Sequence, residues 1–134
     1  MTMASANSTT RLATSSGCSR KAAWPKSWGC SMIAFLAGHG LLGPELVIAH
    51  GVWLTEKDID LLAASGTGLT HQPSSNLRLR AGIAPVGPMI DAGISVGLGM
   101  DGMGVNDDDD FLQEMKLCYR LQGLCRLYLD SPAL

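Results

Sequence analysis

The sequence has little net charge, no long apolar run and no closely paired cysteines, and each of these absences excludes a class of protein. A net charge of −2 and an isoelectric point near 5.8 leave no basic stripe to neutralise phosphates, which argues against nucleic-acid binding. No run approaches the roughly 18 apolar residues of a transmembrane helix, so we expect no membrane association. The 134 residues, of which 46% are hydrophobic, are enough for one domain with its own core.

The cysteines also exclude the common short metal and redox motifs. None of the four is separated from another by two residues, as a zinc knuckle or a thioredoxin-like site would require. They are Cys18, Cys30, Cys118 and Cys125. We therefore expect reduced thiols in a cytoplasmic protein.

Residues 1–28 differ in composition from the rest of the chain. They are rich in Ser, Thr, Ala and Gly, carry only basic charges and show no period of 2 or 3.6. This composition favours a disordered leader, and a transit peptide would share it. A secretory signal is excluded because no apolar central region is present. We expect residues 1–28 to be a leader and residues 29–134 to form the folded part.

Beyond residue 31, helical and extended patterns alternate. Helices are expected from Met32 to the Gly38 break, between Thr55 and Gly66, over 83–92 and over 111–124, and strands over 46–50, 68–71 and 94–98. Thr55 is an N-cap with Asp58 three residues later, an Asp form of the capping box. Alternation of this kind predicts an α/β fold with a parallel sheet, because each helix must carry the chain back before the next strand starts.

Two further local predictions concern the second half of the chain. Pro73–Ser74–Ser75–Asn76 has the composition of a turn, so a loop is expected there. Helix 111–124 follows four aspartates, as the helix dipole prefers, and its apolar residues recur at helical spacing. The face expected to be buried comprises Phe111, Leu112, Met115, Cys118, Tyr119 and either Leu121 or Gln122.

Asp101 is the carboxylate around which the functional interpretation is organised. It follows the expected strand 94–98 in the stretch DAGISVGLGMDGMGVN, and the carboxyl ends of parallel strands are where α/β folds place their chemistry. The same stretch contains Gly97-x-Gly99-x-x-Gly102, which satisfies the dinucleotide fingerprint. A pyrophosphate would then lie beside five carboxylates at the helix entrance, so we reject the nucleotide interpretation.

Three candidate ligands follow successive strands. His50 ends the first strand, His71 ends the second and Asp101 follows the third, so all three are expected at the same edge of the sheet. Histidine and carboxylate side chains in this arrangement are ligands for zinc or iron(II), one ion per site, and the metal would generate a hydroxide nucleophile near neutral pH. Taken alone, a histidine at the end of a strand is more often a structural residue than a ligand.

The sequence from about Gly29 to Leu124 resembles a known family. The matching segments are GLLGPELVIAHGVWLTEKDIDLLAASGTGLTHQPSSNLRLRAGIAPV and MIDAGISVGLGMDGMGVNDD, followed by FLQEMKL. They resemble the amidohydrolase superfamily, in the branch of aminohydrolases and chlorohydrolases that includes atrazine chlorohydrolase, S-adenosylhomocysteine deaminase and 8-oxoguanine deaminase. Several motifs occur in the family's order and spacing.

The resemblance implies a fold and a site. The fold would be part of a (β/α)8 TIM barrel, about its last three strand–helix units. His50 looks like the strand-six histidine that contacts the metal-bound water or the substrate, and Asp101 looks like the strand-eight aspartate that binds the metal and takes a proton from the attacking water. His71 and Asn76 lie in a segment like the family's strand-seven motif and are candidate substrate-binding residues. Trp53 could stack on a flat ring.

The sequence also departs from the family. A His-x-His pair and a His-x-x-Glu pair are absent, and Arg11-Leu12-Ala13-Thr14 stands roughly where one such segment could have been. We therefore expect the carboxyl-terminal portion of a barrel enzyme behind an unrelated or frame-shifted leader. Two functions remain open, namely a metal-dependent hydrolase of C–N or C–Cl bonds on a small nitrogen heterocycle, or an inactive fragment. Open sheet edges would allow homo-oligomers.

Overall fold

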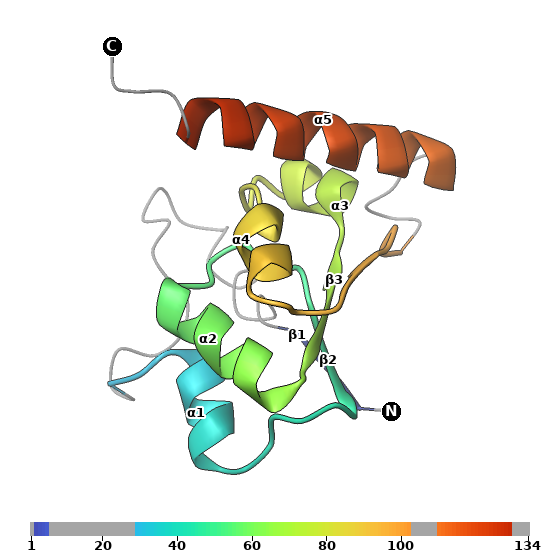
Figure 1. The fold of residues 1–134 in the computed structure, drawn as a ribbon. Helices are drawn as coiled ribbons and strands as arrows, with labels where there is room; N and C mark the ends of the chain where they lie inside the picture. The colour runs from blue at the N-terminus through green and yellow to red at the C-terminus, as the bar shows by residue number, and fades with distance from the viewer. Residues whose placement is uncertain (1, 6–28, 103–109, 130–134) are drawn as a thin grey trace.

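The computed structural model of the chain describes residues 2–5, 29–102 and 110–129, in which helices and strands alternate (Figure 1). The elements in chain order are β1 (Thr2–Ser5), α1 (Met32–Gly38), β2 (Leu46–Ala49), α2 (Glu56–Ser65), β3 (Gly68–His71), α3 (Pro73–Arg78), α4 (Val86–Asp91), β4 (Val96–Leu98) and α5 (Phe111–Leu129). The predicted α/β architecture is confirmed.

The strands form one parallel sheet in the order β1-β2-β3-β4. The three strands predicted from the sequence are β2, β3 and β4, and β4 is shorter than expected because it begins at Val96 rather than Ile94. Strand β1 was not predicted. It lies among the residues expected to be a disordered leader, and it pairs along the whole of β2, with Thr2 opposite Leu46 and Ser5 opposite Ala49.

The core lies between the sheet and the helices that follow its strands. Helices α1, α2 and α4 lie to one side of β2 and β3, whereas α5 crosses above α3 and α4 at the end where β3 finishes (Figure 1). Buried positions alternate along β2 and β3, as expected for strands with two different faces. The buried apolar residues are Ile33, Leu46, Ile48, Val52, Ile59, Leu62, Leu69, Ala81, Ala84, Val86, Met89 and Ile94.

The predicted capping of α2 is confirmed. Thr55 and Asp58 form a reciprocal capping box, and Gly66 ends the helix in the left-handed conformation. The Asp58 carboxylate also accepts a hydrogen bond from the Ser31 hydroxyl, which itself caps α1. One buried carboxylate therefore joins the first turns of two helices.

The turn expected at Pro73–Asn76 is wrong, because these residues form the first part of helix α3. Proline at the first position of a helix costs no hydrogen bond, since that amide has no partner within the helix. Ser75 and Asn76, which favour turns when their side chains bond to the local backbone, are instead buried and bonded to distant residues.

The helices of the second half also differ from expectation. Helix α4 begins only after Pro85, so Ile83 lies outside it. Helix α5 extends to Leu129, and the face expected to be buried is largely exposed, with exposed fractions from 44% to 82% at Phe111, Leu112, Met115 and Tyr119. Its covered face centres on Glu114, which accepts hydrogen bonds from Ser74. Among the described residues, no helix is long and apolar enough to cross a bilayer.

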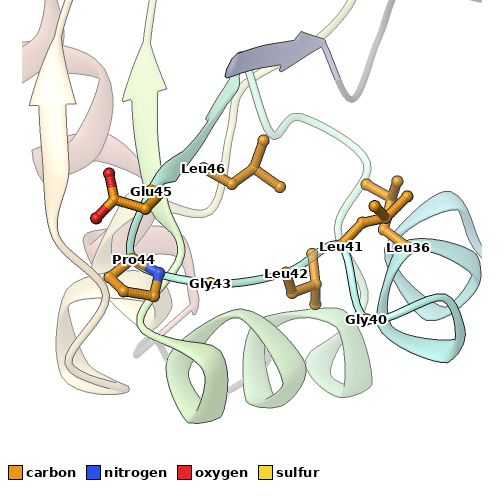
Figure 2. A pocket seen from close by; sticks show the side chains of 8 residues that line it. All are labelled: Leu36, Gly40, Leu41, Leu42, Gly43, Pro44, Glu45 and Leu46. Atoms are coloured by element: carbon orange, nitrogen blue, oxygen red, sulfur yellow. The ribbon is translucent and has the colours of Figure 1, made fainter. Parts of the chain in front are cut away.

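An apolar hollow lies at the amino end of β2, the end opposite to His50. It has a volume of about 430 Å³ and is bounded by the loop that joins α1 to β2 (Figure 2). Its lining residues are Leu36, Gly40, Leu41, Leu42, Gly43, Pro44, Glu45 and Leu46. This end of the sheet therefore presents mainly leucine side chains, and none of the candidate site residues lines the hollow.

Candidate active site

His50 and Asp101 meet at the carboxyl end of the sheet. His50 follows β2 directly and Asp101 lies three residues beyond the end of β4, and His50 Nε2 and Asp101 Oδ2 are 4.0 Å apart. The exposed fractions of the two side chains are 13% and 22%. Parallel strands bring these residues together because their carboxyl ends share one edge, as the sequence analysis expected.

Both residues have a left-handed backbone. The φ angles are 72° at His50 and 64° at Asp101, and among the described residues other than glycine only Arg80 also has a positive φ. The Gly51 amide donates to the Ala49 carbonyl at 3.0 Å, which closes a strained γ-turn centred on His50. Conformations of this kind cost roughly 1–3 kcal/mol each and cluster at functional sites.

The surrounding chain holds His50 in this conformation. Its amide donates to the Thr70 carbonyl at 2.7 Å and to the Gln72 side-chain oxygen at 3.0 Å. A Cβ atom at Gly51 would come within 2.5 Å of Leu69 Cδ1, and φ there is +59°, so the γ-turn requires glycine at its next position. Tertiary contacts therefore stabilise a backbone conformation of His50 that is locally unfavourable.

Helix α3 supplies the side chains that hold the two site residues. The Ser75 hydroxyl donates to Asp101 Oδ2 at 2.6 Å, and Asn76 Oδ1 lies 3.0 Å from His50 Nδ1. The other carboxylate oxygen of Asp101 accepts from the Gly102 amide at 2.9 Å. Ser75 and Asn76 are 0% and 2% exposed, so a polar network runs beneath the rim formed by His50 and Asp101.

His71 is placed differently from the other two candidates. It is 1% exposed, and neither of its ring nitrogens has a hydrogen-bond partner among the described residues. In β3 it shares a face with Leu69, which packs in the core. Burial, and to a lesser degree the charge of His50, lowers the pKa of His71 from 6.5 to about 4. His71 is therefore a neutral, buried imidazole near the site.

The remaining candidates lie on the loops around this edge. Trp53 is 44% exposed in the loop between β2 and α2. Its ring lies beside Gly82, where an added Cβ atom would be 3.9 Å from Trp53 Cζ2. Asp110 caps α5 by accepting from the amides of Leu112 and Gln113, whereas the three aspartates before it fall outside the described residues. The Arg11 segment and Cys18 lie outside them too, and Cys30 and Cys118 are free thiols.

The donor set fits part of a zinc site. An imidazole nitrogen and a carboxylate oxygen are zinc ligands at about 2.0–2.2 Å each, which places tetrahedral ligands about 3.4 Å apart, so the 4.0 Å between these two atoms would have to shorten slightly for both to bind one ion. The described residues contain no group of three or more His, Cys, Asp or Glu side chains placed to hold a metal. This part of the chain therefore offers two ligand types of a zinc site close to each other, but fewer ligands than zinc takes.

Comparison with known proteins identifies the family. Residues 19–131 match the Amidohydrolase family. A 5-methylthioadenosine/S-adenosylhomocysteine deaminase of Thermococcus kodakarensis is 43% identical over 100 residues, which are 75% of this chain and 24% of that protein. A zinc-bound adenosine deaminase from Xanthomonas campestris is 30% identical over 76% of this chain and 23% of its own, with a TM-score of 0.72. The chain belongs to the Amidohydrolase family.

The branch of the family and the barrel fold are also confirmed. Atrazine chlorohydrolase from Arthrobacter aurescens, complexed with zinc, is 33% identical over 61% of this chain and 18% of its own, with a TM-score of 0.58. The sheet corresponds to part of the TIM barrel of these proteins. This chain spans about a quarter of the length of the curated relatives it matches. The family match begins at residue 19, ahead of the boundary expected at Gly29.

Two residues of the network were missed by sequence reasoning. Gln72 and Ser75 were assigned no role, although Gln72 holds the His50 amide and Ser75 holds the Asp101 carboxylate. Both follow a strand that ends on a candidate histidine, and polar residues directly after such a strand lie at the functional edge. The proline at position 73 was interpreted as part of a turn, which concealed the helix that begins directly after Gln72 and carries Ser75.

Proposed function

We propose that this chain forms the part of a metal-dependent amidohydrolase that supplies His50 and Asp101. The reaction class is hydrolysis of a C–N or C–Cl bond on a small nitrogen heterocycle. Relatives named as deaminases of adenosine-type compounds and as an atrazine chlorohydrolase support this class. The observation that carries the proposal is the 4.0 Å approach of His50 Nε2 to Asp101 Oδ2, two residues on left-handed backbone at the carboxyl edge of the sheet.

In this proposal His50 and Asp101 would hold a zinc or iron(II) ion together with ligands from outside the described residues. The metal, when bound, lowers the pKa of a water molecule and makes it a nucleophile. The Asp101 carboxylate would take the proton that this water loses and would pass it to a departing amine or ammonia, while the Ser75 hydroxyl keeps the carboxylate in place. The His50 imidazole faces the same carboxylate, where it would also contact the attacking water or the substrate.

His71, Asn76 and Trp53 have lesser parts in this proposal. His71 and Asn76 are 1% and 2% exposed, so any influence they have on the substrate passes through the residues in front of them. Trp53 is exposed in the loop after β2 and is available to stack on a flat ring. Which heterocycle binds would depend on the loops that surround this edge of the sheet.

We also propose that the 134-residue chain alone has little or no turnover. Two ligands hold a catalytic zinc ion less tightly than the three protein ligands that such sites ordinarily use. The alternative function, a catalytically inactive barrel fragment, is favoured by the same observation, because the described residues lack a group of three metal ligands. The two candidates differ in whether His50 and Asp101 still work when the other strands are supplied.

A chimera tests the proposal. Residues 31–129 would replace the matching segment of the Thermococcus kodakarensis deaminase, and release of ammonia from 5′-methylthioadenosine would be measured with zinc. We expect turnover in the chimera, its loss by 100-fold or more in Asp101→Asn, and no change in Asp91→Asn, which removes an exposed carboxylate from α4. A folded, zinc-loaded chimera without turnover contradicts the proposal, and so does zinc-dependent turnover by the purified 134-residue chain.

Two expectations about context belong to the same proposal. The free thiols of Cys30 and Cys118 support a cytoplasmic location. Strands β1 and β4 are the edges of the sheet, and unpaired strand edges favour association with a second copy or with a complementary part of a barrel. Small heterocyclic substrates remain the expected ligands.

A further inference from the structure

Three consecutive residues in the first turn of α3 each contact a different element. Ser74 donates to Glu114 of α5, Ser75 donates to Asp101 beyond β4, and Asn76 lies against His50 beyond β2. Successive residues of a helix point about 100° apart, so one short turn reaches three segments of the chain. Two of those segments carry the proposed site residues, which makes this turn the natural place from which the site is positioned.

The contact between Asn76 and His50 constrains the protonation of the imidazole ring. Asn76 Oδ1 lies 3.0 Å from His50 Nδ1, and an amide oxygen only accepts hydrogen bonds. In this orientation of the amide, Nδ1 carries the proton. A neutral imidazole has one N–H, so Nε2 carries the lone pair, and Nε2 is the nitrogen that faces Asp101 Oδ2.

We propose that Asn76 is a positioning residue that holds His50 in the Nδ1–H tautomer and thereby presents the Nε2 lone pair to the site. Ser75, the preceding residue, performs the matching task for the carboxylate of Asp101. The left-handed γ-turn fixes the backbone of His50, and Asn76 fixes the ring. Asn76 thus acts through His50 rather than on the substrate directly. The use made of the lone pair rests on the proposed function, whereas the tautomer does not.

The orientation of the Asn76 amide decides between two arrangements. With Oδ1 toward His50, the amide nitrogen Nδ2 is buried and has no partner among the described residues. With the amide reversed, Nδ2 would donate to Nδ1, and His50 would carry its proton on Nε2. The reversed arrangement would turn an N–H toward the metal position and remove the lone pair that a ligand needs. The two arrangements predict different protonated nitrogens on one ring.

The tautomer is measured by long-range ¹H–¹⁵N correlation spectroscopy on the uniformly labelled full chain, without metal, at a pH where His50 is neutral. We expect His50 Nδ1 to give the signal of a protonated nitrogen and Nε2 that of an unprotonated one. His39 is the internal control that assigns the method, because its Nδ1 lies 2.8 Å from a backbone carbonyl, which only accepts. A protonated Nε2 in His50 overturns the proposal, and no variant is needed for that result.

Variants then test whether Asn76 is the cause. Asn76→Leu keeps the number and branching of the side-chain heavy atoms but removes the amide, so the His50 signals should move toward the averaged values of an unconstrained imidazole. Asn76→Asp restores an accepting oxygen and should restore the Nδ1–H signals. Ser74→Ala removes a hydrogen bond from the same helical turn and should leave His50 unchanged. Unchanged His50 signals in folded Asn76→Leu contradict the positioning role.

Zinc titration of the same proteins connects the tautomer to the proposed function. Loss of an outer partner of a metal-bound histidine typically lowers metal affinity 10- to 100-fold, and we expect this loss in Asn76→Leu but not in Ser74→Ala. Equal zinc affinity in wild type and in folded Asn76→Leu with altered His50 signals contradicts the use of the His50 lone pair as a zinc ligand. If the wild-type chain binds no zinc while His50 has the expected tautomer, the proposed function is weakened and the positioning by Asn76 stands.

Discussion

Asp58 and Asp101 both accept a hydrogen bond from a serine hydroxyl, yet they differ in burial and in backbone conformation. Asp58 is 3% exposed within helix α2 and accepts from Ser31 and from both the amide and the hydroxyl of Thr55. The Asp101 side chain is 22% exposed at the end of the sheet, on a backbone with φ of 64°. The first is saturated by donors that start two helices, and the second faces a histidine across a 4.0 Å gap.

The difference teaches how this fold divides its carboxylates between stability and chemistry. A carboxylate used for folding sits on relaxed helical backbone, where nearby donors satisfy it and it is removed from solvent. A carboxylate kept for chemistry stays partly exposed, and the cost of its left-handed backbone is offset by contacts from other elements. Glu114 belongs with Asp58, because it is 2% exposed and accepts from the amide and hydroxyl of Ser74.

The largest effect that would test this comparison is on stability. The Asp58 carboxylate accepts three hydrogen bonds, and in Asp58→Asn one of its oxygens is replaced by an NH2 group, which cannot accept. We therefore expect a loss of about 3 kcal/mol in the free energy of unfolding. Asp101→Asn should change it by less than about 1 kcal/mol, because asparagine tolerates left-handed backbone. Urea unfolding followed by circular dichroism measures both. Equal losses in the two variants would remove the distinction.

The same pair of variants should show the reverse order in zinc binding. We expect Asp101→Asn to weaken zinc binding, because it removes one of the two proposed ligands. Asp58→Asn should leave zinc binding unchanged, because the Asp58 carboxylate is bonded to Ser31 and Thr55. Zinc retained by Asp101→Asn and lost in folded Asp58→Asn would invert the comparison.

Low pH should destabilise the folded chain through a second buried group, the imidazole of His71. His71 has a pKa of about 4 in the folded chain and about 6.5 when unfolded, so the unfolded state binds more protons between these values. The corresponding stability is complete above about pH 6.5 and is lost as the pH falls toward 4. Between pH 7.5 and pH 5 we expect a loss of about 2 kcal/mol from this group. His71→Gln should remove that part of the pH dependence.

The control for this measurement is the pH dependence that wild type and His71→Gln have in common. His71→Gln leaves every carboxylate of the chain in place, so the difference between the unfolding free energies of wild type and variant across the pH range isolates His71. Parallel pH curves for the two proteins would mean that His71 is not held neutral by burial.

The smallest expected effect concerns the left-handed residues. Arg80 follows α3 with φ of 52° and an exposed side chain, so Arg80→Gly should stabilise the chain by about 0.5–1 kcal/mol. His50→Gly relieves similar strain but loses the contact with Asn76, so we expect no gain. Unfolding free energies from urea titration compare the two. A larger gain at His50 than at Arg80 would mean that Asn76 contributes nothing to holding the ring.

Much of the fold was predictable from local patterns. Helix α2 was predicted with its cap at Thr55 and its end at Gly66, because capping and left-handed glycine act within a few residues. Three strands and the edge that carries His50 and Asp101 followed from apolar runs that end on polar residues. Strand β1 was not predicted, because its four residues have no apolar pattern and form a strand only through pairing with β2.

The buried faces were less predictable than the elements. On α5 the apolar residues suggested one face, whereas the covered face contains Glu114, whose partner Ser74 is 40 residues away in the sequence. On α3, proline and two serines indicated a turn, and only contacts with Asp101 and His50 explain why those residues are buried in a helix. Periodicity reports which residues are apolar, but not which surface of the fold is available to cover them.

The sequence by itself determined the order of helices and parallel strands, the family resemblance, and the position of His50 and Asp101 after their strands, because these depend on local pattern and chain direction. Only the tertiary structure decided that the two residues face each other, that His71 turns into the core, and that Ser75 and Asn76 hold the site. The hydrogen bonds concerned join residues 26 positions apart. No local pattern specifies such a pair, because its geometry exists only once β2, α3 and the segment after β4 have packed together.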